Sequence, residues 1–268
     1  MAATTDPSIP QIVYACVSHK TVDAELLVRQ HVIEYILAGT SIAYFGNKSE
    51  TFHAGDIRFA VRNRLSKFVK LPHEGEEYRS IAICIDKNTL MELSAPYERS
   101  IASSQHYDNV LPLRPNNFFK NYIDSLLPYL EHSNQLTGEL LKTKVKEAVL
   151  IFMSANPELK RILFDFSEPG KIDLQAFMEE HYQYSGDLEH MAYLTGRSIS
   201  TFKRDFEKIF HTTPGKWLIQ KKLEAAHVLL KEKKMKPTDV YMEVGFNDYS
   251  HFFSAFKKLF GMAPSMVI

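Results

Sequence analysis

The sequence has few cysteines, no net charge and no long apolar run. Its 268 residues include only Cys16 and Cys84, and the apolar stretch around each predicts a buried free thiol in a reducing compartment. No run approaches the roughly 20 apolar residues that span a bilayer. The first 11 residues lack the basic and apolar parts of a secretion signal. We therefore predict a cytoplasmic protein that does not bind membranes.

Motifs of the common catalytic classes are also absent. We find no phosphate-binding glycine loop, no nucleophile with an adjacent base and no paired carboxylates. The possible metal ligands are scattered along the chain and include no His-x-His pair; they are His31, Glu34, His53 and His73. The sequence therefore predicts no metal, no cofactor and no enzymatic activity.

The N-terminal third consists of short β-rich segments. They lie at residues 12–17, 32–37, 41–45, 57–61, 65–71 and 78–85, separated by turn residues such as Gly39 and Gly55. This spacing favours a small antiparallel barrel or sandwich. Residues 34–39 and 54–57 resemble the front half of a cupin-type sensory domain, which implies a cupin-like antiparallel β-barrel. Such a domain would sense a small ligand or a partner protein, or mediate self-association.

Helical periodicity replaces this pattern in the middle of the chain. Apolar residues recur at helical spacing over residues 118–130 and 138–154, and a shorter helix is expected within 157–166. The apolar stripes suit a core and a homodimer interface equally well, so both remain open. The predicted organisation is a flexible tail (1–10), a cupin-like β domain (11–90), a helical linker or dimerisation region (91–166), a linker (167–170) and an all-α domain (171–268).

The C-terminal region contains an internal repeat. Four apolar residues and one proline recur at an offset of 50 residues. The first copy consists of Phe202, Phe206, Ile209, Phe210 and Pro214, and the second of Phe252, Phe256, Leu259, Phe260 and Pro264. Each set predicts a buried stripe on a helix that follows a glycine-bearing turn, at Gly196 or Gly245. Ser198 is expected to cap the first helix, and either Asn247 or Asp248 the second. The layout is that of two helix-turn-helix modules.

Charge and exposed polar residues indicate what these modules bind. Residues 197–236 carry 11 basic and 4 acidic residues, a local charge of +7 that attracts phosphate. In the first module the predicted base-reading residues are Ser200, Lys203, Arg204 and Glu207. In the second they are Tyr249, Ser250, Phe253 and Ser254. The predicted DNA-backbone contacts are Arg197, Thr201, Lys208, His251, Lys257 and Lys258.

The C-terminal residues carry a specific family resemblance. Gly245, Phe246, Phe252, Phe256, Lys257, Lys258, Phe260, Gly261 and Pro264, with Leu223, Glu224, Ala226, Leu229 and Leu230, resemble the double helix-turn-helix domain of the AraC/XylS transcription regulators. The whole layout is similar to the branch that includes type III secretion activators. The resemblance implies promoter binding and activation through contact with RNA polymerase. Tyr241 and Ser254 depart from the family pattern, so we expect the first module to discriminate more strongly.

One alternative from another functional class remains. A cupin-fold metal-dependent enzyme, or a ligand-binding module whose C-terminal helices mediate protein contacts, would have the same layout of a β-rich region followed by helices. A stoichiometric transition metal accompanied by turnover would favour that alternative.

Overall fold

The computed structural model describes residues 9–23, 25–46, 48–97, 107–114, 117–131, 136–184 and 186–267. The chain divides into two compact units: the first comprises Met1–Thr21 and Val28–Ser167, and the second comprises Val22–Leu27 and Glu168–Ile268. Most of the predicted flexible tail, residues 1–8, lies outside the described residues. Among the described helices, none is long and apolar enough to cross a membrane.

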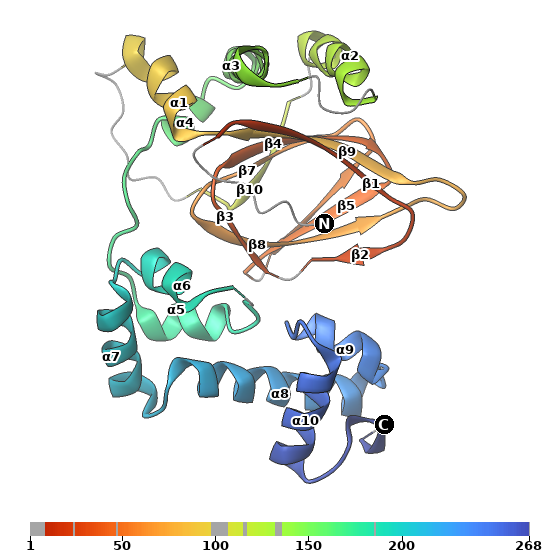
Figure 1. The fold of residues 1–268 in the computed structure, drawn as a ribbon, viewed down its shortest axis with the longest axis vertical. Helices are drawn as coiled ribbons and strands as arrows, with labels where there is room; N and C mark the ends of the chain where they lie inside the picture. The colour runs from red at the N-terminus through yellow and green to blue at the C-terminus, as the bar shows by residue number, and fades with distance from the viewer. Residues whose placement is uncertain are drawn as a thin grey trace. The chain divides into compact units, whose positions relative to one another are not determined.

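The first unit is built on two β-sheets (Figure 1). One has the strand order β1-β9-β4-β7-β10, and the other has the order β2-β8-β5-β6 with β3 also paired to β8. The strands are β1 (Gln11–Val17), β2 (Thr21–Val22), β3 (Leu26–Val28), β4 (His31–Ala38), β5 (Thr40–Phe45), β6 (Lys48–His53), β7 (Ile57–Ala60), β8 (Arg64–Leu71), β9 (Tyr78–Ile85) and β10 (Val110–Leu113). The pairs β1–β9, β4–β9, β4–β7 and β5–β8 are antiparallel, which confirms the predicted antiparallel β fold. The described strands remain two sheets, because no pairing among them joins the edge strands of one sheet to those of the other, so the prediction of a closed barrel is wrong.

Helices cover one face of the first sheet. Ile33 and Ile83 share a core with Phe119 and Phe152, whose ring centroids lie 4.2 Å apart. The helices of this unit are α1 (Lys87–Ser94), α2 (Asn117–Glu131), α3 (Gly138–Ala155) and α4 (Leu159–Leu163), with a 3-10 turn at Ala95–Tyr97. The apolar stripes of α2 and α3 therefore contribute to the core, as one of the two interpretations predicts.

A buried ion pair lies on the opposite face of that sheet, between the two sheets. Arg58 Nε lies 2.9 Å from Glu34 Oε2, and Arg58 Nη1 lies 2.8 Å from Ser41 Oγ on the second sheet. Tyr78 donates its hydroxyl to Glu34 at 3.1 Å, and the guanidinium lies 4.2 Å from the centre of the Phe68 ring. Burial alone would raise the pKa of Glu34, but the Arg58 charge outweighs it and the pKa is lowered. Glu34 is therefore an ionised partner of Arg58.

The histidines considered as metal ligands occupy separate environments. His31 is buried, stacks on Phe59 with 5.1 Å between ring centroids, and accepts a hydrogen bond from the Arg62 amide. Burial lowers the pKa of His31 to about 3, so its ring is neutral. His53 and His73 are exposed. Within the described ranges, no group of three or more His, Cys, Asp or Glu side chains is placed to hold a metal ion.

The two cysteines differ in exposure. Both are free thiols, and Cys84 is buried as predicted. The prediction is wrong for Cys16, which is exposed and lies 3.0 Å from Glu77 Oε2. Its strand, β1, stands at the edge of its sheet and alternates between more and less exposed residues, so an apolar sequence does not guarantee burial there.

The C-terminal part of the second unit, residues 168–268, is helical, as predicted. Its helices are α5 (Leu174–Glu180), α6 (Leu188–Leu194), α7 (Ile199–Phe210), α8 (Pro214–Lys233), α9 (Pro237–Glu243) and α10 (Tyr249–Phe260), followed by a 3-10 turn at Pro264–Met266. Figure 1 shows α6 and α7 near the start of the long helix α8, and α9 and α10 near its end. Proline at the first position of α8 favours initiation there, since that residue needs no amide donor.

Candidate nucleic-acid interface

Two glycines form the turns that the repeat predicts. Gly196 has a φ of +64° and Gly245 a φ of +85°, the left-handed region that only glycine adopts without strain. Each turn also lies against another backbone segment. A Cβ added to Gly196 would lie 2.4 Å from the Gly170 carbonyl carbon, and one added to Gly245 would lie 2.2 Å from the Gln183 oxygen. Both positions therefore require glycine for conformation and for space.

Side-chain caps fix the starts of the two helices that follow these turns. Ser198 Oγ accepts a hydrogen bond from the Thr201 amide at 3.3 Å, and Asp248 Oδ1 accepts one from the His251 amide at 2.7 Å. Such caps satisfy amides that have no partner within the helix. The cap of α10 is thus Asp248, one of the two residues that the sequence leaves open.

Helix α8 joins the two modules through aromatic contacts near both of its ends. Near its start, the Trp217 ring lies 4.7 Å from that of Phe210 on α7. Nearer its end, the His227 ring lies 4.8 Å from that of Phe260 on α10. The predicted core residues Phe202, Phe206, Phe252 and Phe256 are fully buried. The repeat therefore encodes two similar aromatic cores that share one helix.

Two members of the predicted stripes are exposed. Ile209 is 38% exposed and Leu259 is 45% exposed, so the prediction that both belong to the core is wrong. Each stands in the last turn of its helix, where α8 contacts the neighbouring Phe210 or Phe260 instead. The error is the same in both modules because the residues occupy equivalent positions.

The predicted reading residues of α7 share one exposed face. Their spacing of three and four residues places them on the same side of a helix. The exposed members are Ser200, Lys203, Arg204 and Glu207. The Arg204 side chain is 76% exposed, and its Nη2 lies 3.7 Å from Asp205 Oδ1. Lys208 is also exposed and Thr201 is half-buried, so this face presents mainly cationic and hydroxyl groups to solvent.

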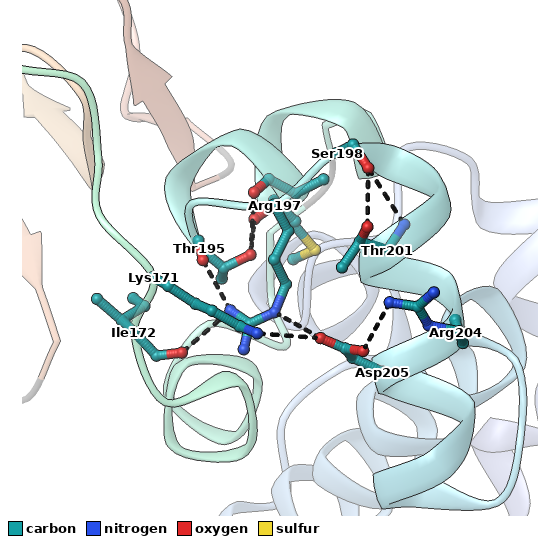
Figure 2. A network of polar contacts seen from close by, with 10 residues as sticks. Lys171, Ile172, Thr195, Arg197, Ser198, Thr201, Arg204 and Asp205 are labelled. Atoms are coloured by element: carbon teal, nitrogen blue, oxygen red, sulfur yellow. Dashed lines mark hydrogen bonds and ion pairs between the residues drawn. The ribbon is translucent and has the colours of Figure 1, made fainter.

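Arg197 differs from the other predicted DNA contacts, because its guanidinium points into the domain (Figure 2). Only 7% of its side chain is exposed. Its Nε lies 3.2 Å from Asp205 Oδ2, and its Nη1 donates to the carbonyls of Ile172 at 3.0 Å and Thr195 at 2.7 Å. The hydrogen bond from Arg197 lowers the pKa of Asp205. These bonds tie α7 to the start of the domain through Arg197, so its guanidinium is not presented to solvent as the lysines among the predicted backbone contacts are.

The corresponding face of α10 is less polar. Ser250 and Ser254 are exposed, whereas Tyr249 and Phe253 are half-buried. The Tyr249 ring lies 5.5 Å from that of Tyr241 on α9, so a tyrosine at position 241 is accommodated by an aromatic contact. The predicted backbone contacts on this helix are all exposed; they are His251, Lys257 and Lys258.

Sequence reasoning missed one polar residue inside this domain. Lys222 is 8% exposed, and its Nζ donates to the carbonyl oxygens of Tyr184 at 3.1 Å and Gly245 at 2.8 Å. The available signal was its position in the buried stripe of α8, four residues before Ala226 and eight before Leu230. A lysine at core spacing indicates a buried acceptor.

Comparison with known families agrees with this architecture. Residues 191–267 match the model of a helix-turn-helix domain, and residues 31–162 match the model of the ExsA N-terminal regulatory domain. Together these models account for most of the chain and for both units.

Relatives with similar sequences are transcription regulators. The chain is 31% identical over 124 residues to the HTH-type transcriptional regulator ExsA of Pseudomonas aeruginosa, a match covering 46% of this chain and 45% of ExsA. It is 30% identical over 145 residues to the thermoregulatory protein LcrF of Yersinia pestis, covering 53% of each. Each match thus spans about half the length of the relative. These matches agree with the resemblance of the chain to the AraC/XylS family of transcription regulators, and its N-terminal domain resembles the regulatory domain of ExsA.

A solved structure aligns with most of the chain. The crystal structure of apo ToxT K231A from Vibrio cholerae aligns with 96% of each chain, at 13% sequence identity and a TM-score of 0.48.

Proposed function

We propose that the protein is a sequence-specific DNA-binding transcription regulator. The observation that carries this proposal is the duplicated helix-turn-helix, in which two glycine turns and two capped helices share one connecting helix. An exposed face of α7 with Lys203 and Arg204 supplies cations where a recognition helix enters the major groove. The scattered placement of His31, Glu34, His53 and His73 gives no support to the enzyme alternative.

The first module supplies most of the base discrimination. Arg204 is suited to a bidentate contact with guanine, because its guanidinium is exposed and presents parallel donors. Ser200, Lys203 and Glu207 read neighbouring bases from the same face of α7. Lys208 and Thr201 contact phosphates beside it.

The second module reads less of the sequence. Its contacts are Tyr249, Ser250, Phe253 and Ser254 toward the bases, with His251, Lys257 and Lys258 toward the backbone. Phe253 can rest on a thymine methyl, but neither serine has the reach of an arginine. Helix α8 has 20 residues and spans about 30 Å, which suits two helices in successive major grooves roughly 34 Å apart.

Selection from a randomised duplex library with the full-length chain tests this function. We expect enrichment of sites with two conserved segments centred about 10 base pairs apart, one helical turn, with the stronger preference in one segment. Recovery of no preferred sequence would contradict the proposal, provided that the purified protein is folded.

The regulator acts as an activator in the cytoplasm and contacts RNA polymerase at the promoter. A relative from Yersinia enterocolitica, 30% identical over 145 residues, is described as the virulence regulon transcriptional activator VirF, and this supports activation. Transcription from a reporter that carries the selected site, with and without the protein, distinguishes activation from repression.

The N-terminal unit works through association. Its intersheet interior is occupied by the Glu34–Arg58 pair, so a small ligand there would have to displace buried charges. An apolar groove of about 600 Å³ lies between α2 and α3, with Phe118 (72% exposed) and Leu150 (50% exposed) in its lining. Exposed apolar surface of this kind favours contact with another protein, and a second copy of the chain is the occupant.

A further inference from the structure

Lys222 occupies the middle of the helix that joins the two modules. It stands five residues after Trp217, which contacts the first module, and five before His227, which contacts the second. The aromatic contacts hold each module to its own part of α8. These contacts do not explain what fixes the orientation of one module relative to the other at the centre of α8.

The ammonium group of Lys222 bonds to both modules. One acceptor is the carbonyl of Tyr184, which precedes α6, and the other is the carbonyl of Gly245 in the turn before α10. Tyr184 is itself buried, and its hydroxyl lies 2.9 Å from His190 Nδ1 on α6. Lys222 therefore links the turn of the second module to a residue anchored on the first helix of the first module.

The two backbone segments also touch beside this lysine. A Cβ at Gly245 would lie 2.2 Å from the Gln183 oxygen and 3.2 Å from Lys222 Nζ. At this contact between the modules, the backbone at Gly245 therefore packs directly against the backbone at Gln183, with no side chain between them. Buried carbonyls need donors, and the ammonium group supplies two to this junction.

We propose that Lys222 is a positioning residue that sets the orientation of one helix-turn-helix module relative to the other, and hence the spacing of the two DNA segments that the chain recognises. This inference rests on the proposed DNA-binding function. A lysine suits the role because one cationic group can bond several carbonyls at once.

Stability alone does not explain a lysine at this position. Burial lowers the pKa of Lys222 to about 8, because desolvation disfavours the charged form. An apolar side chain of similar length would fill the space without that penalty, as replacements of buried charges in other proteins show. Such a side chain cannot donate hydrogen bonds to the Tyr184 and Gly245 carbonyls.

The distance between the two recognition helices tests the proposal without DNA. Spin labels are attached at Ser200→Cys and Ser250→Cys, exposed residues at equivalent positions of α7 and α10, in the full-length Cys16→Ser protein. Cys84 stays unlabelled, because burial raises its pKa to about 11. Double electron–electron resonance then compares Lys222→Met with Lys221→Met, a matched control whose side chain is 43% exposed.

We expect a narrow distance distribution in the parent and in Lys221→Met, and one at least about twice as broad in Lys222→Met, since lost hydrogen bonds release the junction. Equal widths in all three would overturn the proposal. Circular dichroism confirms that each variant is folded. If Lys222→Met does not fold, Lys222→Gln, which is too short to keep both bonds, is judged by the same criterion.

DNA binding supplies the second test. The duplex selected by the unlabelled wild-type chain is compared with one carrying an extra base pair between the two recognised segments. We expect the insertion to weaken the wild type and Lys221→Met by at least about tenfold, and Lys222→Met by less than about threefold. An equal penalty for all three proteins would overturn the spacing role. If selection enriches no sequence, the proposed function fails, while the resonance result still decides whether Lys222 orients the modules.

Discussion

At the scale of single residues, the pair Glu34 and Arg58 shows how buried charge is stabilised in the N-terminal unit. The Arg58 side chain is 3% exposed and that of Glu34 is 10% exposed. Removing one partner leaves the other charged and without compensation in a poorly solvated interior. Glu34→Gln should therefore reduce the free energy of unfolding by about 3–5 kcal/mol, measured by chemical denaturation at neutral pH.

A surface ion pair in the same unit is the matched control. Lys48 Nζ lies 2.6 Å from Asp108 Oδ1, with side chains 65% and 49% exposed. Solvent screens this pair, so Lys48→Met should change the free energy of unfolding by less than about 1 kcal/mol. Equal losses for Glu34→Gln and Lys48→Met would show that burial of the first pair has no energetic consequence.

At the scale of elements, the turns before α7 and α10 combine a left-handed backbone conformation with close contact. Gly245→Ala should reduce the free energy of unfolding by more than about 2 kcal/mol, because the left-handed φ costs about 1–2 kcal/mol and the Gln183 oxygen leaves no room. Gly261 has a φ of +72° but no neighbour within 4 Å, so Gly261→Ala should lose only about 1 kcal/mol.

A third glycine completes this series. Gly215 lies in the first turn of α8, has no neighbour within 4 Å and lacks a positive φ. Gly215→Ala should be neutral or should stabilise by up to about 1 kcal/mol, since alanine favours helix. Thermal unfolding of the three variants in parallel separates conformation from contact. A ranking in which Gly215→Ala is the most destabilising would contradict this account of the turns.

The helices were predictable because their signals are local. Phenylalanines at helical spacing define α7 and α10, and the serine and aspartate caps stand next to them in the sequence. By contrast, β6 (Lys48–His53) was not predicted, because its residues are polar and only Phe52 is buried. An edge strand with a solvated face lacks the alternation that marks a strand.

Contacts made through backbone groups could not be predicted. Arg197 carries the same charge whether it binds phosphate or the Ile172 carbonyl, and only the fold shows which acceptor is near. Lys222 likewise depends on the carbonyls of Tyr184 and Gly245, which are 38 and 23 residues away. The sequence therefore indicates which faces are apolar, but not which polar groups those faces bring together.

At the scale of the whole molecule, the groove between α2 and α3 predicts a homodimer. Phe118→Asp and Leu150→Asp each place a charge in this apolar surface and should convert the dimer to a monomer in sedimentation equilibrium. Met91→Asp on α1 is the control, because Met91 is 52% exposed and is not part of the groove lining. If the wild type is monomeric at micromolar concentration, or if Met91→Asp dissociates it equally, the interface lies elsewhere.

The central claim is that two unequal modules read DNA sequence, and titration of the selected duplex against Arg204→Ala and Lys258→Ala tests it most directly. Arg204→Ala should lose about 1–3 kcal/mol on that duplex and relax the preference at one base pair, with a much smaller loss on unrelated DNA. Lys258→Ala should weaken both duplexes alike and reduce the salt dependence by about one phosphate contact. Unchanged affinity of Arg204→Ala for the selected duplex, or equal weakening on both, would contradict the account.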